Sequence, residues 1–241
     1  MIELDAAQVT AWAPGPGGAP ERVVRLLGPV TLRLAERRVA VVGANGSGKS
    51  TLARLVNGLV RPSSGAVRVD GWDTVRDAAA VRRRVGFLFT DPEAQLLMPT
   101  PVEDVLLSLR RLPSRQRREV ALAWLDRFGL AGHADAPVHT LSGGQKQLLA
   151  LAAVLAAEPA VLVADEPTTL LDLRWRSVVD AVLADLDQQL LLVTHDLDAA
   201  GRAERVLVVD GGTVVHDGLP APALDAYRGL MAGRAGLAGA R

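Results

Sequence analysis

The sequence contains no cysteine, so it can form neither a disulfide framework nor a thiolate metal site. Aromatic residues make up only 3% of the chain, so the core has to consist of valine, leucine and alanine, as in α/β folds with buried parallel strands. The 27 basic and 27 acidic residues balance. A chain without net charge has no overall attraction to nucleic acid, so nucleic acid is not an expected partner.

Long apolar runs are also absent. The longest, LLALAAVLAA at residues 148–157, is shorter than the about 20 residues that a membrane-spanning helix needs, and Glu158-Pro159 ends it. The N-terminal MIELDAAQVT starts acidic and lacks the apolar run of a signal peptide. We therefore expect a cytosolic protein whose role at a membrane comes through a partner.

Short apolar runs of strand length recur along the chain. They are RVAVVG (38–43), RVGFLF (84–89), AVLVAD (160–165), QLLLVTHD (189–196) and RVLVVD (205–210). Helical patterns lie between several of them, which predicts a mostly parallel sheet covered by helices. The last run and TVVHDG flank Gly211-Gly212, a pattern typical of a β-hairpin.

The middle of the chain, from about residue 90 to 158, has no convincing strand and predicts a helical subdomain. Ala121, Trp124, Leu125 and Phe128 form an apolar stripe with helical spacing. The preceding basic run, RRLPSRQRRE, is interpreted as a solvated helix face rather than a binding patch. The stretch APGPGGAPE (13–21) predicts a surface loop. We expect one domain, with a nucleotide-binding core of residues 1–89 and 159–241.

The segment GANGSGKST, residues 43–51, fits the phosphate-binding pattern G-x-x-x-x-G-K-[ST] between a strand and a helix. Its backbone N–H groups and the positive end of the next helix favour a phosphate chain. Lys49 is expected to neutralise the β- and γ-phosphates, Ser50 to ligate Mg²⁺ and Thr51 to donate to the α-phosphate. The expected nucleotide-binding residues of this phosphate cradle are Gly43, Asn45, Gly46, Ser47, Gly48, Lys49, Ser50 and Thr51.

A phosphate cradle alone does not separate a kinase, a GTPase and an ATPase. The apolar run AVLVADEP ends in Asp165 and Glu166, which a parallel sheet places at its carboxyl edge. Asp165 is suited to hold Mg²⁺, and Glu166 to polarise an attacking water molecule. From these residues alone, a strand-ending turn explains the stretch equally well.

The segment LSGGQ, residues 141–145, places a serine and two glycines at the start of an apolar helix, which is a second anion site. With these three motifs in this order, the chain resembles the ATP-binding subunit of ABC transporters over almost its entire length. The resemblance implies an α/β P-loop NTPase fold with a mostly parallel core sheet, antiparallel β elements and a helical subdomain. It implies head-to-tail pairing, with each ATP between one cradle and the partner's LSGGQ, so that Ser142, Gly143, Gly144 and Gln145 bind nucleotide.

The resemblance assigns further residues. Asp172 ends TTLLD (168–172), similar to the family's D-loop, and would reach across the dimer. His195 in VTHD (193–196) would contact the γ-phosphate and Glu166, completing a catalytic set with Lys49. Trp12 lies where the family stacks an aromatic ring on adenine. For His133, His139 and His216 we expect only structural roles.

Thr90 follows the run RVGFLF where the family usually carries the Q-loop glutamine, which approaches Mg²⁺ and the attacking water and links the site to the transmembrane subunits. Thr90 is therefore the expected residue at the metal, although a glutamine amide reaches roughly 2.5 Å farther than its hydroxyl. A bridging water can fill such a gap. Gln95, five residues later, matches a different glutamine of a variant loop.

The segments DPEAQLLMPTPVEDV and DEPTTLLDLR are most similar to energy-coupling factor (ECF) transporters, which import vitamins, cobalt and nickel; QLLMPT and TTLLDLR look closest to biotin-uptake ATPases. This implies ATP and Mg²⁺ as ligands and a place at the cytoplasmic face of the membrane. The implied partners are a second ATPase copy or paralogue, a transmembrane coupling protein and a small membrane substrate-binding protein. The chain ends soon after AYRGLM, so no extra C-terminal dimerisation domain is expected.

Other interpretations remain. A cobalt or nickel ECF importer is the alternative substrate class. A soluble ABC ATPase acting on DNA or ribosomes usually needs a coiled-coil insertion or two ATPase domains, and neither is found here. A regulatory module that binds ATP without turnover is suggested by Thr90, but the retained Lys49, Glu166 and His195, together with Asp165, argue against it.

Overall fold

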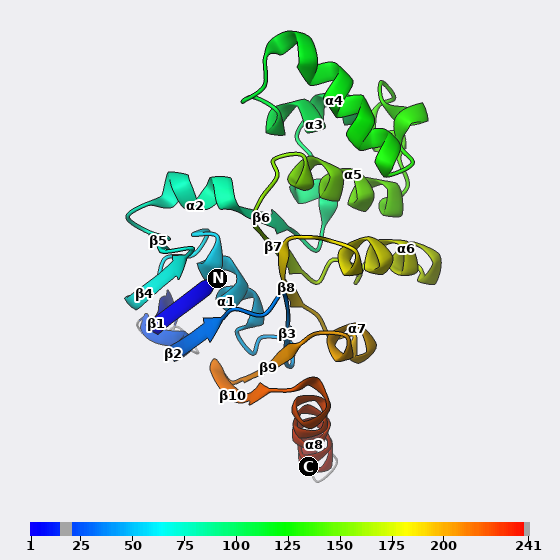
Figure 1. Ribbon diagram of the computed structural model, residues 1–241. Coiled ribbons are helices and arrows are strands. Elements are labelled where there is room, and N and C mark those ends of the chain that lie inside the picture. Colours follow the sequence, from blue (N-terminus) through cyan, green and yellow to red (C-terminus); the bar gives the residue numbers. More distant parts are fainter. Residues whose placement is uncertain (15–20, 239–241) are drawn as a thin grey trace. The chain divides into compact units, whose positions relative to one another are not determined.

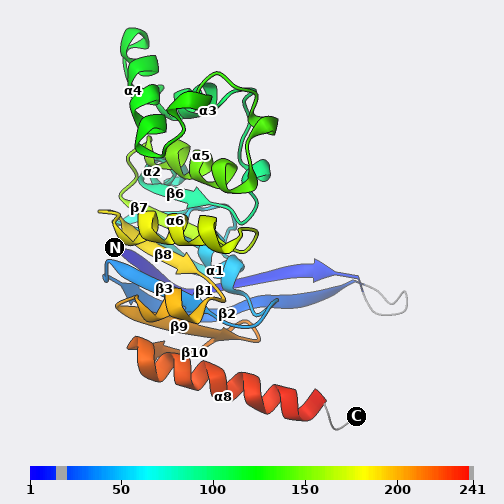
Figure 2. The same ribbon diagram turned by 90° about the vertical axis from the view of Figure 1, so that its right-hand side faces the viewer.

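The computed structural model describes residues 1–14 and 21–238, in two compact units (Figures 1 and 2). The first unit comprises Met1–Arg82 and Gln189–Arg241, and the second comprises Arg83–Gln188. The predicted surface loop at 13–21 lies mostly outside the described residues, since residues 15–20 are not among them. Strands β6 (Val85–Leu88) and β7 (Val161–Asp165) and helix α6 (Leu173–Ala184) belong to the second unit, together with the helices expected between 90 and 158.

An antiparallel four-stranded sheet forms one part of the first unit. Its strands are β1 (Ile2–Ala13), β2 (Arg22–Leu34), β4 (Ser64–Val69) and β5 (Trp72–Asp73), in the order β2-β1-β4-β5. Along β1, Ile2, Leu4, Ala7 and Val9 are buried. The pairing of β1 shifts register between Leu4 and Ala7, where Ala6 adopts a φ of +44°. Such a bulge bends the strand and redirects its side chains.

Parallel strands form the other sheet of the first unit. Strand β3 (Arg38–Val42) pairs in parallel with both β8 (Gln189–Val193) and β9 (Arg205–Asp210). Strand β10 (Thr213–Gly218) runs antiparallel to β9, which confirms the predicted hairpin around Gly211-Gly212. The helices of this unit are α1 (Lys49–Val56), α7 (Leu197–Gly201) and α8 (Pro220–Ala238), with α2 (Ala78–Arg84) at its border.

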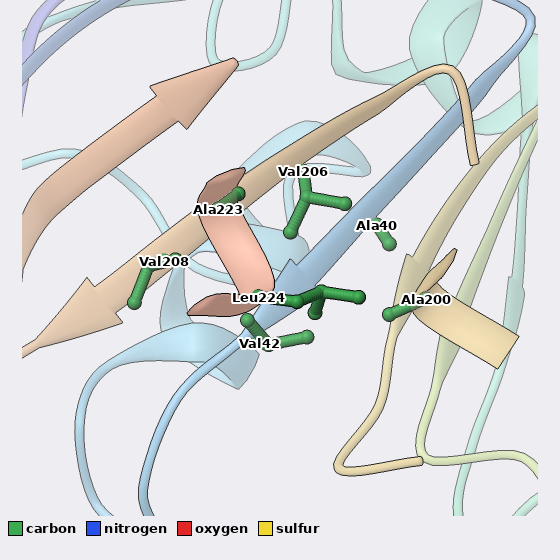
Figure 3. Packing of buried hydrophobic residues seen from close by; sticks show 7 residues of the cluster. All are labelled: Ala40, Val42, Ala200, Val206, Val208, Ala223 and Leu224. Carbon is green, nitrogen blue, oxygen red and sulfur yellow. The ribbon is translucent and has the colours of Figure 1, made fainter. Parts of the chain in front are cut away.

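The core of this sheet consists of small aliphatic residues, as the scarcity of aromatic residues predicts. Figure 3 shows one buried cluster between the sheet and its helices. Its members are Ala40 and Val42 from β3, Val206 and Val208 from β9, Ala200 from α7, and Ala223 and Leu224 from α8. Because side chains alternate along a strand, the buried Val39 and Val41 lie on the other face of β3. Burial on both faces fixes β3 rigidly, and β3 leads directly into residue 43.

The second unit combines a parallel strand pair with helices. Strands β6 (Val85–Leu88) and β7 (Val161–Asp165) pair in parallel, and every residue of β7 is buried. The helices are α3 (Pro101–Ser108), α4 (Ser114–Arg127), α5 (Gly143–Leu155) and α6 (Leu173–Ala184). Short 3₁₀ turns lie at η2 (Pro92–Ala94), η3 (Ala131–His133) and η4 (Val138–Thr140).

Helix α4 carries the predicted apolar stripe. Ala121 and Leu125 are fully buried, Phe128 is nearly so, and Trp124 is half-buried. The basic run at the start of α4 is largely exposed, as expected for a solvated face. Within residues 1–14 and 21–238, no helix combines the length and the apolar character that crossing a membrane requires.

Candidate functional site

The phosphate cradle, residues 43–51, joins β3 to α1. Two of its glycines are required by the surrounding backbone. A Cβ on Gly43 would lie 2.1 Å from the carbonyl oxygen of Val209. Gly48 has a φ of +106°, and a Cβ there would lie 2.8 Å from the carbonyl oxygen of Leu26. Only glycine fits both positions, so the loop is held in a fixed curve by its neighbours.

The start of α1 is built for an anion. Its N-cap is Gly48, which has no side chain that could cap the helix N-terminus by a hydrogen bond. Lys49 is almost fully buried, and its Nζ donates to the carbonyl oxygens of Gly43 (2.8 Å) and Ala44 (3.1 Å). The Ser47 hydroxyl is buried with no hydrogen-bond partner among the described residues. A helix N-terminus, an ammonium group and an orphaned hydroxyl together suit a phosphate group.

A cavity of about 450 Å³ opens beside this helix start. Its walls come from residues 24–26 of β2, residues 46–51 of the cradle, and Gly211 and Gly212 of the β9–β10 turn. Trp12 lies on β1, where it pairs with Val23, the residue before this wall, and its side chain is 71% exposed. An exposed indole near the cavity wall is available for stacking against a ligand ring. The expected role of Trp12 at adenine stays a prediction.

His195 lies close to the cradle along the sheet edge. Val41 of β3 pairs with Val193 of β8, and the two strands run in parallel. Gly43 and His195 each lie two residues beyond this pair. They therefore come at the same distance past the paired ends of β3 and β8. The N–H of Thr194 donates to the carbonyl oxygen of Val41 (3.1 Å), which fixes this turn. His195 itself is exposed, in keeping with contact to a ligand.

In the second unit, Asp165, Glu166 and Thr90 lie at the carboxyl ends of β7 and β6. Leu88 pairs with Ala164, so Thr90 and Glu166 follow the two strands at the same level. The Thr90 hydroxyl donates to the main-chain oxygen of Asp165 at 2.7 Å. The Asp165 side chain is buried. Glu166 has a φ of +54° and accepts a hydrogen bond from the Thr169 hydroxyl at 2.8 Å.

The segment after Thr90 turns back on β6. Gln95 accepts from the N–H of Phe89 (3.2 Å) and donates to the carbonyl oxygen of Phe87 (3.3 Å). Its amide therefore completes the hydrogen bonds of the strand end. A second amide, Gln147 of α5, donates to the carbonyl oxygen of Phe89 (3.2 Å) and is fully buried. Gln147 was not expected from the sequence, where its one signal is a polar residue inside an apolar helix.

The LSGGQ segment, residues 141–145, starts α5 with a complete capping box. Ser142 Oγ accepts from the N–H of Gln145 (3.3 Å), and Gln145 Oε1 accepts from the N–H of Ser142 (2.8 Å). The Gln145 Nε2 atom then faces His133 Nε2 at 3.2 Å. Because Nε2 of a glutamine is a donor, His133 accepts this hydrogen bond through an unprotonated nitrogen. His133 therefore supports the capping box, a contact that the sequence did not indicate.

Asp172 caps helix α6. It is the N-cap of α6, where its carboxylate accepts from the N–H of Trp175 at 2.9 Å. Leu170 and Leu173, on either side of it, are 64% and 78% exposed. Exposed leucines next to a fixed carboxylate indicate a surface suited to a partner. Trp175 itself packs on Gly144 and was also missed by the sequence analysis.

The expected site residues thus fall into two sets. The first unit brings the cradle and His195 to the carboxyl ends of β3 and β8, and it places Trp12 on β1, paired with Val23 next to the wall of the cavity. The second unit brings Thr90, Asp165 and Glu166 to one strand end, and presents Ser142 and Asp172 at two helix starts. The first set has the chemistry to bind phosphates. The second set offers carboxylates, hydroxyls and a further helix start.

Comparisons with known proteins identify the family of the chain. The ABC transporter family profile matches residues 28–169. A putative ABC transporter ATP-binding protein of Deinococcus radiodurans is 48% identical over 86% of this chain and 92% of its own length. The biotin transport ATP-binding protein BioM of Rhizobium etli is 41% identical, with the same shares of both chains. The energy-coupling factor transporter ATP-binding protein EcfA1 of Lactiplantibacillus plantarum is 40% identical over 76% of this chain and 68% of its own.

Solved structures share the fold. The ATP-binding cassette MJ0796, in a dimeric post-hydrolysis state bound to ADP and Pi, matches with a TM-score of 0.79 and 29% identity, covering 91% of this chain and 99% of its own. The structure of cbiO1 from Clostridium perfringens, part of the ABC transporter complex cbiONQ, matches with a TM-score of 0.77 and 29% identity, covering 93% and 90%. The expected fold class is thereby confirmed.

Proposed function

Because this chain belongs to the ABC transporter family of ATP-binding proteins and is an ATPase, we propose that it drives a membrane importer of the energy-coupling factor type. The observation that carries the proposal is the cradle, where Lys49 and the start of α1, whose N-cap is Gly48, line a cavity of about 450 Å³. The similarity to BioM supports biotin as the imported vitamin. The second candidate is a cobalt or nickel importer, the other substrate class of the energy-coupling factor type.

ATP binds through its phosphates at the cradle in this proposal. The backbone of residues 43–51 and the dipole of α1 hold the phosphate oxygens, and Lys49 neutralises the β- and γ-phosphates. Thr51 donates to the α-phosphate, and the exposed Trp12 stacks on adenine. Because the binding energy comes mainly from backbone N–H groups and Lys49, loss of Lys49 weakens nucleotide binding more than loss of Trp12.

Magnesium fits the donor set of this chain. Hydroxyl and carboxylate oxygens are the ligands that Mg²⁺ prefers, and Ser50, Asp165 and Thr90 offer these groups. A bound Mg²⁺ neutralises charge on the phosphate oxygens during transfer. Thr90 would take this place through its oxygen lone pairs, since its hydroxyl proton is donated to the main chain of Asp165.

Hydrolysis requires a base beside the γ-phosphate. In the proposed step, a water oxygen bonds to the γ-phosphorus. The bond from that phosphorus to the β–γ bridging oxygen breaks, and this oxygen leaves as part of ADP. Glu166 accepts the proton of the water, with its carboxylate oriented by the Thr169 hydroxyl. His195 donates to the γ-phosphate and steadies Glu166. This assigns the three catalytic roles to Lys49, Glu166 and His195.

A second copy of this chain is the proposed pairing partner, with a paralogous ATPase as the alternative. The chain carries a phosphate cradle and a separate LSGGQ helix start, the two halves of a shared site. Two-fold pairing builds two such sites, in which Ser142, Gly143, Gly144 and Gln145 of one copy face the nucleotide of the other. Asp172 and the exposed Leu170 and Leu173 lie where a partner surface is needed.

The membrane partners are proposed to be a transmembrane coupling protein and a small substrate-binding membrane protein, which would hold this chain at the cytoplasmic face. The test co-expresses the chain with the membrane proteins encoded beside it and measures uptake of labelled biotin, with labelled cobalt in parallel. Uptake of biotin that is lost with Glu166→Gln supports the proposal. Uptake of cobalt selects the second candidate, and ATP hydrolysis without association with either membrane protein rejects the importer.

A further inference from the structure

Trp175 packs flat against the backbone of Gly144 at the first turn of α5. A Cβ on Gly144 would lie 2.1 Å from both Cγ and Cδ2 of the Trp175 ring and 2.5 Å from its Cδ1. The guanidinium of Arg174 lies 5.5 Å from the centre of the same ring. Residue 144 can therefore be only glycine while the indole keeps this place, and the indole is half-buried between a backbone and a cation.

The same tryptophan also holds Asp172. Its backbone N–H donates to the Asp172 carboxylate at 2.9 Å, the bond that caps the start of α6. One residue thus touches the last residue of the 168–172 segment with its main chain and the LSGGQ segment with its ring. These segments start different helices, α6 and α5, and Trp175 connects their first turns.

Helix α6 has buried residues of its own beyond Trp175. They are Val179 and Leu183, one to two turns farther along. The Trp175 ring instead lies against Gly144, which belongs to the first turn of another helix, α5. Its contact therefore joins the starts of two helices.

We propose that Trp175 is a positioning residue that holds Asp172 and the LSGGQ segment at a fixed spacing, so that both engage the partner's nucleotide together. The inference rests on the proposed pairing of two copies. Groups that bind one ligand together must be held within roughly 0.5 Å of their binding geometry by rigid neighbouring residues. Without the indole, the two segments move independently, and pairing has to order both of them.

The test measures ATP-driven dimerisation by sedimentation in a Glu166→Gln parent, which retains bound ATP. Adding Trp175→Ala should raise the ATP concentration needed for half-dimerisation by about tenfold or more. Trp175→Phe keeps a ring over Gly144 and should raise this concentration much less. Trp124→Ala is the matched control, because Trp124 is a half-buried tryptophan on α4 that stacks with Phe128. Its effect on dimerisation should stay within about twofold.

Binding of ATP to the monomer separates positioning from general damage. In a Ser142→Arg background that blocks pairing, Trp175→Ala should leave ATP affinity within about twofold, because the cradle and its cavity contain no part of α5 or α6. Urea unfolding of each variant checks that it is folded. A Trp175→Ala protein that dimerises like its parent would overturn the inference. Failure of the parent itself to dimerise would instead reject the proposed pairing.

A double-mutant cycle tests the contact itself. Gly144→Ala alone should abolish dimerisation, since the new methyl group collides with the indole. In the Trp175→Ala background the same methyl group has room, so its added effect should be at least about tenfold smaller than in the parent. Equal effects in both backgrounds would show that the indole does not set the spacing, and would overturn the inference even if both single variants are impaired.

Discussion

Glu166 adopts a backbone conformation that residues with a side chain rarely take. Its φ of +54° lies in the left-handed region, directly after the buried β7 and its Asp165. Such a conformation costs about 1–3 kcal/mol at a residue other than glycine. The turn positions the Glu166 carboxylate against the Thr169 hydroxyl. Strain at this residue is consistent with a group placed for chemistry rather than for stability.

Substitution of Glu166 should therefore separate stability from activity. Glu166→Gly is expected to unfold with a free energy about 1 kcal/mol higher than Glu166→Ala, because glycine adopts a positive φ without strain. Both variants should lose about 10²- to 10⁴-fold in hydrolysis, since the base is absent. Urea titration and steady-state ATPase assays measure the two quantities. Equal stability of the two variants would show that the turn is unstrained, and near-normal hydrolysis would remove Glu166 as the base.

Thr90 is the residue at which the chain departs from the family pattern. Its hydroxyl donates to the main-chain oxygen of Asp165, next to Glu166. Thr90→Val keeps the shape of the side chain but removes the hydroxyl that donates to the Asp165 main-chain oxygen. We therefore expect kcat to fall by about tenfold while KM for ATP changes little. Thr90→Ser retains the hydroxyl and is the control that should stay near wild type. Equal kcat for the valine and serine variants would show that this hydrogen bond does not position the catalytic turn.

The loop before α3 is held by one buried carboxylate. Asp104 accepts from the N–H of Leu97 (2.9 Å) and from that of Met98 (3.2 Å). Burial raises the pKa of Asp104 above its ordinary 3.8, although these hydrogen bonds lower it in part. Leu97, 75% exposed, is thereby presented to solvent from an ordered backbone. Asp104 thus orders this loop at the expense of a buried charge.

This pKa shift predicts how stability depends on pH. A carboxyl with a raised pKa in the folded state binds its proton more tightly there, so its contribution is most favourable below pH 3.8 and declines as pH rises through the raised value. The unfolding free energy of Asp104→Asn, relative to wild type, should therefore increase between pH 3.5 and pH 7, as read by urea titration. Asp104→Ala should lose about 1–3 kcal/mol at pH 3.5, because two N–H groups lose their acceptor, and this loss should become smaller toward pH 7 as the contribution of the wild-type carboxyl declines. A pH-independent difference for the asparagine variant would contradict the shift.

The parallel strands and the cradle could be predicted from sequence because their signals are local. The runs RVAVVG and AVLVAD are buried β3 and β7, and the glycine pattern after β3 fixes the cradle. Antiparallel β elements were expected only through the resemblance to the family, because β1 pairs with the distant β4 and its bulge at Ala6 breaks the alternation of buried residues. Side-chain hydrogen bonds such as that from Gln147 to the carbonyl oxygen of Phe89 could not be predicted from the sequence either, since they depend on how α5 packs on β6.

At the scale of the whole chain, two helix starts differ in what they can bind. The N-cap of α1 is Gly48, which has no side chain to cap the helix, whereas the start of α5 is capped by its own Ser142 and Gln145. The first is ready for phosphate by itself. The second offers mainly the Ser142 hydroxyl proton, since Ser142 Oγ already accepts from Gln145. ATP should therefore bind the cradle of a monomer first, and pairing should follow.

Complementation between two disabled copies tests the shared nucleotide most directly. In the Glu166→Gln background, one pool carries Lys49→Ala in the cradle and the other carries Ser142→Arg at the start of α5. Neither pool alone can form an intact site, whereas a mixed pair has one site with an unaltered cradle and an unaltered LSGGQ segment. Sedimentation with ATP and Mg²⁺ should find monomers in each pool and dimers only in the mixture. Monomers in the mixture, while the Glu166→Gln parent dimerises, would contradict a nucleotide shared between two copies.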